Sequence, residues 1–408
     1  MNKIFIVASW ADIKTNNGFD RLSYVARTFS NNDFETTLVT SDYNHHGKKF
    51  HENINETLFD YKIKLIHELG YRGNISIKRI LSHAIFARNI KKYLFQLKKE
   101  DYPNVIYVSM PFSTATLACK SFCKKNNIPL IVDVIDLWPE AFIGITSVPR
   151  ILSQTMVLPW QLLSNKAYRC ADAIVSHNYT YLNRALKETK ENIPNEMVYL
   201  GSDLQFAEKC QEKYDDEIFK GEDEFWISYV GSLAENYDLD TIVLAVSKLK
   251  QKGINNIKIL FLGTGPYENK LKGLAENLNV NYFITGYIEY AKLIAYLCKC
   301  DIAMNAIKNP VIIISYKTSD YFTAGLPIIN SSKGELQNLI DKHKMGFYYK
   351  TGDVKMLAEK IETLYSDRNL LKQMKDNSKI FANQYLDKKK NYIKLVNLAN
   401  NMLREKKI

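Results

Sequence analysis

The sequence predicts an α/β protein made of two doubly wound parallel-sheet domains that face each other across a cleft. Its 408 residues are too many for one ordinary core and suit two domains of roughly 150 to 200 residues each. Short β-branched runs alternate with helical patterns, which is typical of parallel βαβ units. The second half of the chain repeats the scheme of the first, so each half is expected to form one Rossmann-like domain.

The first half opens with the run KIFIVAS (3–9), which is too short for a signal-peptide core and is therefore interpreted as a strand. A glycine-bearing loop at 16–18 and a helix over 20–29 are expected to follow it. The further elements expected in this half are the strands TTLVTSD (36–42), VIYVSM (105–110), PLIVDVI (129–135) and ADAIVSHN (171–178), with a helix over 113–125.

The second half contains runs that are apolar on consecutive residues, as strands of a sheet buried on both faces must be. The expected strands are FWISYVGSL (225–233), IKILFLGTGP (257–266), VNYFITGY (280–287), DIAMNA (301–306) and GLPIINS (325–331), with a helix over 240–251. The polar, acidic segment 200–223 indicates a loop, and the joint is expected there. Residues 1–205 are therefore predicted to form the N-terminal domain and residues 206–384 the C-terminal domain.

The formal net charge of +11 is concentrated in one part of the N-terminal half, since residues 48–125 hold 15 Lys and Arg against six Asp and Glu, an excess of 15 − 6 = +9. Such an excess favours nucleic acid, an anionic membrane surface or phosphorylated ligands as partners. No run of about 18 uncharged apolar residues is present, so we expect a soluble or peripheral protein.

The six cysteines are expected to be the reduced thiols of a cytoplasmic protein, buried as small hydrophobic side chains. The two close pairs, Cys119 with Cys123 and Cys298 with Cys300, lack the third and fourth ligands of a zinc site. The D-x-D sequence at 238–240 can hold a divalent ion, but it begins an expected helix, where Asp is an ordinary capping residue. No metal is predicted.

Glycine turns mark the places where ligands of open parallel sheets bind, namely the carboxyl ends of strands and the N-termini of helices. In the second half such turns hold Gly231 and the run Gly263-Thr264-Gly265-Pro266. This run falls short of the G-x-G-x-x-G fingerprint because position 268 is a glutamate, which disfavours a nicotinamide dehydrogenase. A plain structural turn is an equally good interpretation of these glycines.

Residues 311–329, VIIISYKTSDYFTAGLPII, form the most specific stretch of the chain. Lys317 lies one turn before Asp320 at an expected helix start. A lysine beside the backbone donors of a helix N-terminus suits a diphosphate, and a nearby carboxylate can accept hydrogen bonds from ribose hydroxyls. A solvated Lys–Asp pair on a helix surface is the alternative.

With this stretch the chain resembles the family 4, retaining, GT-B-fold glycosyltransferases, especially the bacterial members that build O-antigen, capsule or exopolysaccharide. Ser315 to Ile329 follow the spacing of the family pattern P-S-K-x-x-E-Y-x-A-x-G-x-P-V-I. The resemblance extends over nearly the whole chain, and its other matching pieces are the loop near Gly18, the run 136–140, ADAIVS (171–176), YVG (229–231) and LGTGP (262–266).

The chain departs from the family pattern at positions that matter for the donor. The first of the family's two spaced glutamates falls on Ile312 and the second on Asp320. The arginine that commonly follows the Gly231 turn is Ser232, and the lysine expected a few residues later is absent. Neutralisation of a diphosphate is therefore expected to depend on Lys317, backbone amides and helix dipoles.

The resemblance implies a metal-independent, retaining transfer from a nucleotide-diphosphate sugar, most simply a UDP-sugar, to a lipid-linked or saccharide acceptor in bacterial surface polysaccharide synthesis. It implies no cofactor and no nucleic-acid partner, and it places the acceptor in the N-terminal domain, onto which the tail 385–408 packs back. The residues assigned to the donor are Gly18, Gly231, Ser232, Gly263, Gly265, Pro266, Ser315, Lys317, Asp320 and Tyr321, those assigned to the acceptor are Asn17, Arg21, Trp138 and Glu140, and those assigned to catalysis are Lys317, Asp320, Asp136 and Glu140. The Gly18 and Gly231 amides are expected to stabilise the leaving diphosphate together with Lys317.

The run Asp136-Leu137-Trp138-Pro139-Glu140 follows an expected strand, so its side chains should face the cleft. Family members with a histidine near this place use it against the sugar, and the corresponding residue here is Ile135. Asp136 or Glu140 can orient the acceptor hydroxyl or take its proton. A structural role for Asp136, tying the loop through backbone hydrogen bonds, is equally open.

Two helical segments point to a membrane surface. Residues 75–99 carry apolar side chains at helical spacing with basic residues between them, so this helix either covers its own sheet or lies on an anionic leaflet. Residues 148–169, with Met156, Leu158 and Trp160, are a second candidate that would guide a lipid-linked acceptor. Peripheral attachment at the inner face of the cytoplasmic membrane is therefore expected.

Two other functions stay open. A sugar-nucleotide epimerase or hydrolase can use the same scaffold, because a fold does not determine a function. A non-enzymatic polyanion binder would use the charge of +11, although the sequence has no recognised nucleic-acid module.

Overall fold

The computed structural model of the chain describes residues 1–13, 20–45, 47–52, 54–73, 76–142, 150–308 and 315–405. These fold into two compact units, which are described here one at a time. Unit 1 comprises Met1–Val198 with Lys389–Ile408, and unit 2 comprises Tyr199–Lys388. The unit limits lie a few residues from the domain limits expected at 205/206 and 384/385.

Unit 1 contains a seven-stranded sheet of order β5-β2-β1-β6-β7-β8-β9 in which every neighbouring pair is parallel. Its strands are β1 (Asn2–Ala8), β2 (Phe34–Ser41), β5 (Lys62–Ile66), β6 (Val105–Met110), β7 (Leu130–Val134), β8 (Ala173–Ser176) and β9 (Asn195–Met197), with a small antiparallel pair β3 (Tyr43–Asn44) and β4 (Lys49–Phe50). Its helices are α1 (Arg21–Ser30), α2 (Ile77–Gln96), α3 (Ser113–Asn126), α4 (Arg150–Arg169), α5 (Tyr179–Leu186) and α15 (Ile393–Glu405). The short α14 (Lys388–Asn391) leads into α15.

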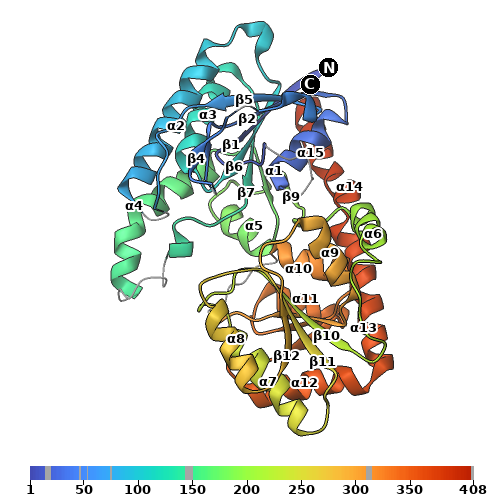
Figure 1. The fold of residues 1–408 in the computed structure, drawn as a ribbon. Coiled ribbons are helices and arrows are strands. Elements are labelled where there is room, and N and C mark those ends of the chain that lie inside the picture. The colour runs from blue at the N-terminus through green and yellow to red at the C-terminus, as the bar shows by residue number, and fades with distance from the viewer. Residues whose placement is uncertain are drawn as a thin grey trace. The chain divides into compact units, whose positions relative to one another are not determined.

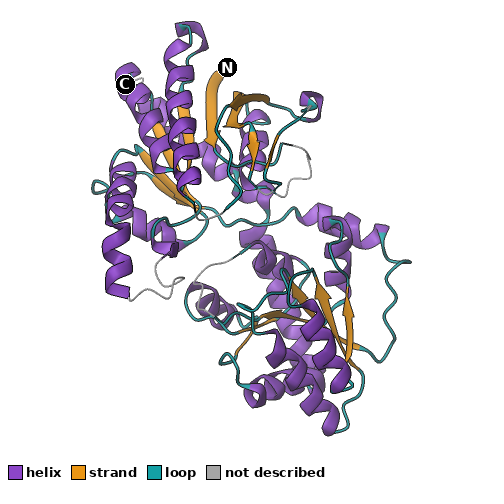
Figure 2. Cartoon of the chain, turned by 60° about the vertical axis from the view of Figure 1, so that its left-hand side comes forward, coloured by secondary structure: helices purple, strands orange, loops and turns teal. Residues whose placement is uncertain are grey.

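Unit 2 contains a six-stranded, all-parallel sheet of order β12-β11-β10-β13-β14-β15. Its strands are β10 (Phe225–Val230), β11 (Ile257–Leu262), β12 (Asn281–Ile284), β13 (Ile302–Asn305), β14 (Ile328–Asn330) and β15 (Gly346–Tyr348). Its helices are α6 (Leu204–Lys213), α7 (Leu239–Gln251), α8 (Glu268–Asn277), α9 (Tyr290–Lys299), α10 (Tyr316–Thr323), α11 (Glu335–His343), α12 (Val354–Ser366) and α13 (Arg368–Phe381). Two doubly wound parallel-sheet units, as predicted, are thus present (Figure 1), and Figure 2 shows helices flanking the strands of each.

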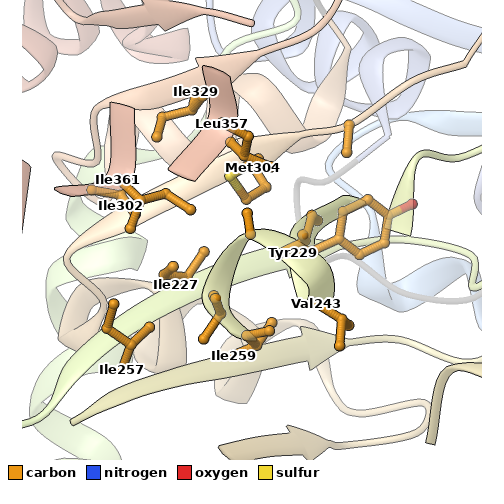
Figure 3. Packing of buried hydrophobic residues seen from close by; sticks show 14 of the residues in the cluster. Ile227, Tyr229, Val243, Ile257, Ile259, Ile302, Met304, Ile329, Leu357 and Ile361 are labelled. Carbon is orange, nitrogen blue, oxygen red and sulfur yellow. The ribbon is translucent and has the colours of Figure 1, made fainter. Parts of the chain in front are cut away.

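The core of unit 2 explains why its strands are apolar on consecutive residues. Ile227, Ile259 and Ile302, from three neighbouring strands, are fully buried against Val243 of α7 and Leu357 of α12 (Figure 3). Helices on both faces leave no side of these strands to water, so alternation of polar and apolar residues is absent.

The C-terminal tail contributes to the core of unit 1. Tyr392, Leu395 and Met402 belong to the same buried cluster as Val25 and Phe29 of α1, and Figure 1 shows α15 beside α1. Helix α1 itself begins where the Asp20 carboxylate accepts a hydrogen bond from the Ser23 amide at 2.9 Å, an ordinary N-cap.

The segment 200–223, expected to be a loop, contains helix α6, and that expectation was wrong. The helix forms because it has a partner: the Phe206 ring stacks on Tyr290 of α9 with centroids 5.8 Å apart, and Ala207 and Cys210 are buried. An acidic, polar stretch can still be a helix when tertiary packing covers one stripe of it.

All six cysteines are free, and four of them are buried. Within the described ranges, no three His, Cys, Asp or Glu side chains are grouped so as to hold a metal ion. None of the helices described has the length and apolar character that crossing a membrane requires.

Candidate functional site

Two glycine loops of unit 2 pack tightly against each other at the carboxyl ends of β10 and β11. A Cβ on Gly263 would lie 2.0 Å from the carbonyl oxygen of Gly231, and one on Gly265 would lie 2.2 Å from the carbonyl oxygen of Leu233. The Leu233 amide also donates to the carbonyl of Thr264 at 3.0 Å. Both glycines are therefore required by loop-on-loop packing, while a contact of either with a donor stays a prediction.

The Gly231 amide, expected to stabilise the leaving diphosphate, already has a partner in the fold. This N–H donates to the Leu262 carbonyl at 3.2 Å and so continues the β10–β11 ladder, which leaves it unavailable to a phosphate. Ser232 and Pro266 are exposed beside it. The Ser232 carbonyl accepts a hydrogen bond from the Tyr229 hydroxyl at 3.0 Å, which fixes the ring of Tyr229 under the loop.

Lys317, in the first turn of α10, places a buried ammonium at this edge. Its Nζ lies 5.0 Å from the ring centre of Tyr229 and 4.9 Å from that of Tyr237. Among the residues that the structure describes, this Nζ has no hydrogen-bond partner. Burial lowers the pKa of Lys317 to about 8. Two ring faces compensate a buried cation only in part, so an anion at this place would be strongly favoured.

Asp320, one turn later, is held inside unit 2 rather than presented to a ligand. Its Oδ1 accepts hydrogen bonds from the Ser202 hydroxyl at 3.0 Å and the Tyr290 hydroxyl at 2.8 Å. The side chain is 4% exposed, and burial raises its pKa to about 6. These contacts fasten α10 to α9, and a direct bond from Asp320 to ribose has no support in the geometry.

Tyr321 and Ser315 also fix the position of α10. The Tyr321 hydroxyl accepts from the Val230 amide at 2.7 Å and donates to the Met304 carbonyl at 3.3 Å, which ties the helix to the ends of β10 and β13. The tyrosine is fully buried, so a direct contact of Tyr321 with the donor has no support in this geometry. The Ser315 amide donates to the Thr318 hydroxyl at 3.0 Å, so Ser315 caps the helix that carries Lys317.

The two carboxylates of the D-x-D sequence are engaged by the protein. Asp238 accepts from the Thr241 hydroxyl at 2.7 Å and from the Tyr349 hydroxyl at 3.0 Å. Asp240 accepts from the Tyr267 hydroxyl through Oδ2 at 2.7 Å, while its Oδ1 is buried without a hydrogen-bond partner among the described residues. Asp238 stands at the N-cap position of α7 but makes no capping bond to an amide of that helix; its Oδ2 accepts from the Gly352 amide at 2.9 Å instead.

Arg21, assigned to the acceptor, is held in the core of unit 1. It is 1% exposed, and its Nε and Nη2 donate to the Asp133 carboxylate at 2.8 and 3.2 Å. Its Nη1 donates to the Val198 carbonyl at 2.9 Å and to the Tyr392 hydroxyl at 3.3 Å. With Tyr107 donating to Asp133 at 2.7 Å, this network anchors the C-terminal tail in the core of unit 1.

The Asp136–Glu140 run forms a loop at the carboxyl end of β7. Asp136 accepts from the Leu137 amide and from the Trp138 indole Nε1, each at 2.9 Å. Burial raises the pKa of Asp136, partly offset by the bond from Trp138. Both oxygens of Asp136 thus hold the loop together. This favours a structural role for Asp136 over a role in orienting the acceptor hydroxyl.

Glu140 keeps one oxygen available. Its Oε1 accepts from Arg184 Nε at 2.6 Å and from Gln161 Nε2 at 3.0 Å. Its Oε2 is buried and has no hydrogen-bond partner within the described part of the chain. The ion pair to Arg184 holds the carboxylate in one orientation, with the second oxygen ready for a donor group.

An aromatic cluster around Arg79 escaped the sequence analysis. The Arg79 guanidinium carbon lies 4.4 Å from the ring centre of Trp138, 5.2 Å from Trp10 and 5.4 Å from Tyr71. The His83 ring packs edge-on against Phe112 at 4.3 Å and over Trp138 at 6.0 Å. Trp10, Phe112 and Trp138 each follow the carboxyl end of a strand, and this common placement was the signal that could have identified the cluster.

Burial sets the protonation of the cluster. It lowers the pKa of Arg79 and lowers that of His83 to about 3, so His83 is neutral at physiological pH. The cluster therefore combines aromatic faces with a single desolvated guanidinium. Rings of this kind stack on sugars, and a guanidinium binds carboxylates or phosphates. Asn17, Gly18 and Ile312 lie outside the described residues.

Most of unit 2 is similar to a known protein family. Residues 211–381 match the family model described as glycosyl transferases group 1. A search of curated proteins finds no match.

Several solved structures share the fold of the whole chain. Sucrose-phosphate synthase from Thermosynechococcus elongatus aligns with a TM-score of 0.73 at 12% identity, over 99% of this chain and 100% of that one. HepE from Anabaena, solved in complex with UDP, aligns with a TM-score of 0.69 at 12% identity over 99% of each chain. WaaG, a glycosyltransferase involved in lipopolysaccharide biosynthesis, aligns with a TM-score of 0.65 at 13% identity, over 97% of this chain and 99% of that one. The chain therefore has the GT-B glycosyltransferase fold of two Rossmann-like units and carries a group 1 glycosyltransferase domain over residues 211–381.

Proposed function

We propose that the protein is a retaining glycosyltransferase that moves a sugar from a UDP-sugar to a lipid-linked or other saccharide acceptor in bacterial surface polysaccharide synthesis. The observation that carries the donor part is the buried ammonium of Lys317, which lies near the rings of Tyr229 and Tyr237 and has no hydrogen-bond partner among the described residues. It lies in the domain that matches the glycosyltransferase family. Support for a uridine nucleotide comes from HepE, which was solved with UDP and with UDP-glucose.

In the proposed reaction the bond between the anomeric carbon and the diphosphate oxygen breaks, and a bond from the acceptor oxygen to the same carbon forms. The diphosphate leaves with the electron pair, and the acceptor hydroxyl loses its proton. Lys317, protonated below its pKa of about 8, stabilises the charge that develops on the leaving group. Metal independence is part of the proposal, because Asp238 and Asp240 already accept hydrogen bonds from the protein.

On the acceptor side we assign the carboxyl edge of unit 1. The Glu140 Oε2 oxygen is the proposed acceptor of the hydroxyl proton or hydrogen bond, since Arg184 occupies the other oxygen. Trp138 and its neighbouring rings would stack on the acceptor sugar, and Arg79 would meet an anionic group of the acceptor. A lipid-diphosphate-linked acceptor provides both, and the protein would then work at the inner face of the cytoplasmic membrane.

Calorimetric titration with UDP, UDP-sugars, GDP and dTDP tests the donor site. Lys317→Ala should weaken UDP binding by about 10- to 100-fold, the range expected for a charge-assisted bond to a diphosphate. Lys258→Ala is the matched control: Lys258 also lies over a ring, 5.5 Å from the Trp226 centre, but at the amino end of the sheet. Equal affinity of the Lys317 variant and the parent would contradict the donor site, as would the absence of nucleotide binding.

Product analysis tests the chemistry. Nuclear magnetic resonance of the product should show the donor's anomeric configuration retained in a new glycosidic bond, with the rate unchanged by a chelator. A Glu140→Gln variant should lose turnover while still binding UDP, because the substitution removes the basic oxygen and leaves the donor site intact. Epimerised donor, or free sugar with acceptor unused, would indicate an epimerase or a hydrolase instead.

A further inference from the structure

Helix α4 of unit 1 exposes four large apolar side chains between residues 156 and 162. Met156, Leu158, Trp160 and Leu162 are 61%, 52%, 46% and 59% exposed. Between Arg150 and Lys166 the helix carries no charged residue. Ser164, Ala167 and Tyr168 anchor the helix by their burial, whereas residues 155–160 are exposed or half-buried. Apolar exposure of this extent marks an interaction surface.

Helix α2 adds positive charge and more apolar surface. Ile77, Ile80 and Leu81 in its first turns are 78%, 45% and 52% exposed. No Asp or Glu occurs between Glu68 and Glu100. The exposed basic side chains of this acid-free stretch are Arg72, Lys78, Arg88, Lys91, Lys92, Lys98 and Lys99.

The two apolar patches lie at the same end of one helix layer. Strands β5 and β7 are part of the same parallel sheet, so the helices that follow them, α2 and α4, both begin at its carboxyl edge. Helix α3 packs against both of them, and Figure 1 shows α2, α3 and α4 along one side of the unit. The exposed apolar residues of α2 and α4, together with the basic side chains along α2, are here called the α2–α4 surface.

We propose that the α2–α4 surface docks the protein onto a lipid bilayer that contains anionic phospholipid. Apolar side chains without acidic neighbours enter the boundary below the headgroups, and the basic flank meets their negative charge. The 15 uncharged residues 151–165 are fewer than the roughly 20 that a spanning helix needs, so α4 lies in the interface and does not cross.

Docking acts on the proposed acceptor site through a direct contact. Gln161 of α4 donates to the Oε1 oxygen of Glu140 at 3.0 Å, so the docking helix and the acceptor loop are joined. Membrane binding would therefore bring Glu140 and Trp138 to the level of the headgroups, where a lipid-linked saccharide begins. This consequence rests on the proposed function, whereas docking itself can be measured without any sugar.

Vesicle co-sedimentation of the full chain tests the proposal. The protein should bind phosphatidylcholine vesicles that contain phosphatidylglycerol, should bind pure phosphatidylcholine more weakly, and should be released by salt. Binding should also shift the emission of the most exposed tryptophan, Trp160, to the blue, because Trp226 is buried at 2% exposure and Trp10 and Trp138 are half-buried.

A triple variant, Met156→Ser with Leu158→Ser and Leu162→Ser, should reduce partitioning at least about tenfold, since three exposed apolar side chains are lost. The matched control exchanges Phe219, Tyr287 and Ile380, which are 88%, 91% and 62% exposed on unit 2, for serine and should bind as the parent does. UDP affinity of both variants serves as the folding check.

Three results would overturn the proposal: no binding of the parent to anionic vesicles, equal binding of the α4 variant, or a concentration-dependent dimer that the α4 variant abolishes while vesicle binding is absent. If the protein binds UDP but not vesicles, only the docking proposal is contradicted. If it binds vesicles but not UDP, only the proposed donor site is contradicted.

Discussion

Arg21 in unit 1 and Lys317 in unit 2 are both buried cations in the first turn of a helix, yet their surroundings differ completely. The Arg21 guanidinium donates to Asp133, to the Val198 carbonyl and to the Tyr392 hydroxyl. The Lys317 ammonium meets two tyrosine rings and, among the described residues, no hydrogen-bond acceptor. Both cations are removed from water, and what separates them is whether the fold has already saturated their hydrogen-bond donors.

The pKa directions express the same difference. Burial is the largest single influence on Arg21 and would lower its pKa, but Asp133, Tyr392 and Tyr107 together outweigh it and raise the pKa well above its ordinary value. For Lys317 burial acts without such opposition and lowers the pKa to about 8. Arg21 is thus stabilised by its site, while the charged form of Lys317 is destabilised until an anion arrives.

The largest expected effect is on the structural cation. Arg21→Met should lower the free energy of unfolding by about 3–5 kcal/mol, because it leaves Asp133 buried without its ion-pair partner. Urea denaturation followed by circular dichroism measures this loss. The double variant Arg21→Met with Asp133→Leu should recover part of it, and a loss below about 1 kcal/mol in the single variant would show that the network is not the anchor of the tail.

Removal of Lys317, the proposed diphosphate-binding cation, should change the free energy of unfolding in the opposite direction. Lys317→Met should raise the free energy of unfolding at pH 7 by about 1–3 kcal/mol, since a cation whose pKa is depressed by burial is lost. Below pH 8 Lys317 is protonated in both the folded and the unfolded parent, so the full cost of burying its charge opposes folding. Between about 8 and the ordinary value of 10.5 only the unfolded state keeps it, and the parent gains stability as pH rises.

Unfolding curves of parent and Lys317→Met should therefore converge above pH 10.5. A destabilised variant at pH 7 would mean that Lys317 already has a satisfying partner in the folded chain, and the contrast with Arg21 would disappear.

The glycine loop at 263–265 should tolerate a substitution of glycine by alanine less well than the neighbouring helix α8 does. Gly265→Ala should cost about 1–3 kcal/mol, because its Cβ would lie 2.2 Å from the Leu233 carbonyl oxygen. Gly273→Ala, in α8 with nothing within 4 Å of the added Cβ, should instead stabilise by about 1 kcal/mol through helix propensity. Thermal unfolding measures the stability change of both variants. Equal shifts in their melting temperatures would contradict loop-on-loop packing as the reason for Gly265.

The strands were predictable because buried parallel strands are apolar residue after residue, as Ile257–Leu262 shows. The edge strand β5 was missed because its lysines are exposed and interrupt the apolar run. Lys317 could be singled out from the sequence because its motif is local. The structural role of Arg21 could not be predicted, because its partners Asp133 and Tyr392 lie 112 and 371 residues away.

The same limit explains Asp320, whose partner Ser202 is 118 residues distant, and the Arg79 cluster, which several strand ends assemble. Local spacing identifies which residues can do chemistry. It does not reveal whether the fold has already used their hydrogen-bonding capacity, because that depends on contacts between distant segments.

The smallest expected effect is the uptake of a fraction of a proton when UDP binds. Above pH 8 the free protein carries Lys317 partly neutral, and a bound diphosphate favours the ammonium, so UDP binding should take up protons there and fewer below pH 7. Calorimetry at pH 9 in two buffers of different ionisation enthalpy measures the uptake. The uptake should vanish in Lys317→Ala and persist in Lys258→Ala. Proton release, or an uptake that the Lys317 variant retains, would place the diphosphate against some other group and would leave Lys317, unlike Arg21, without an explanation for its burial.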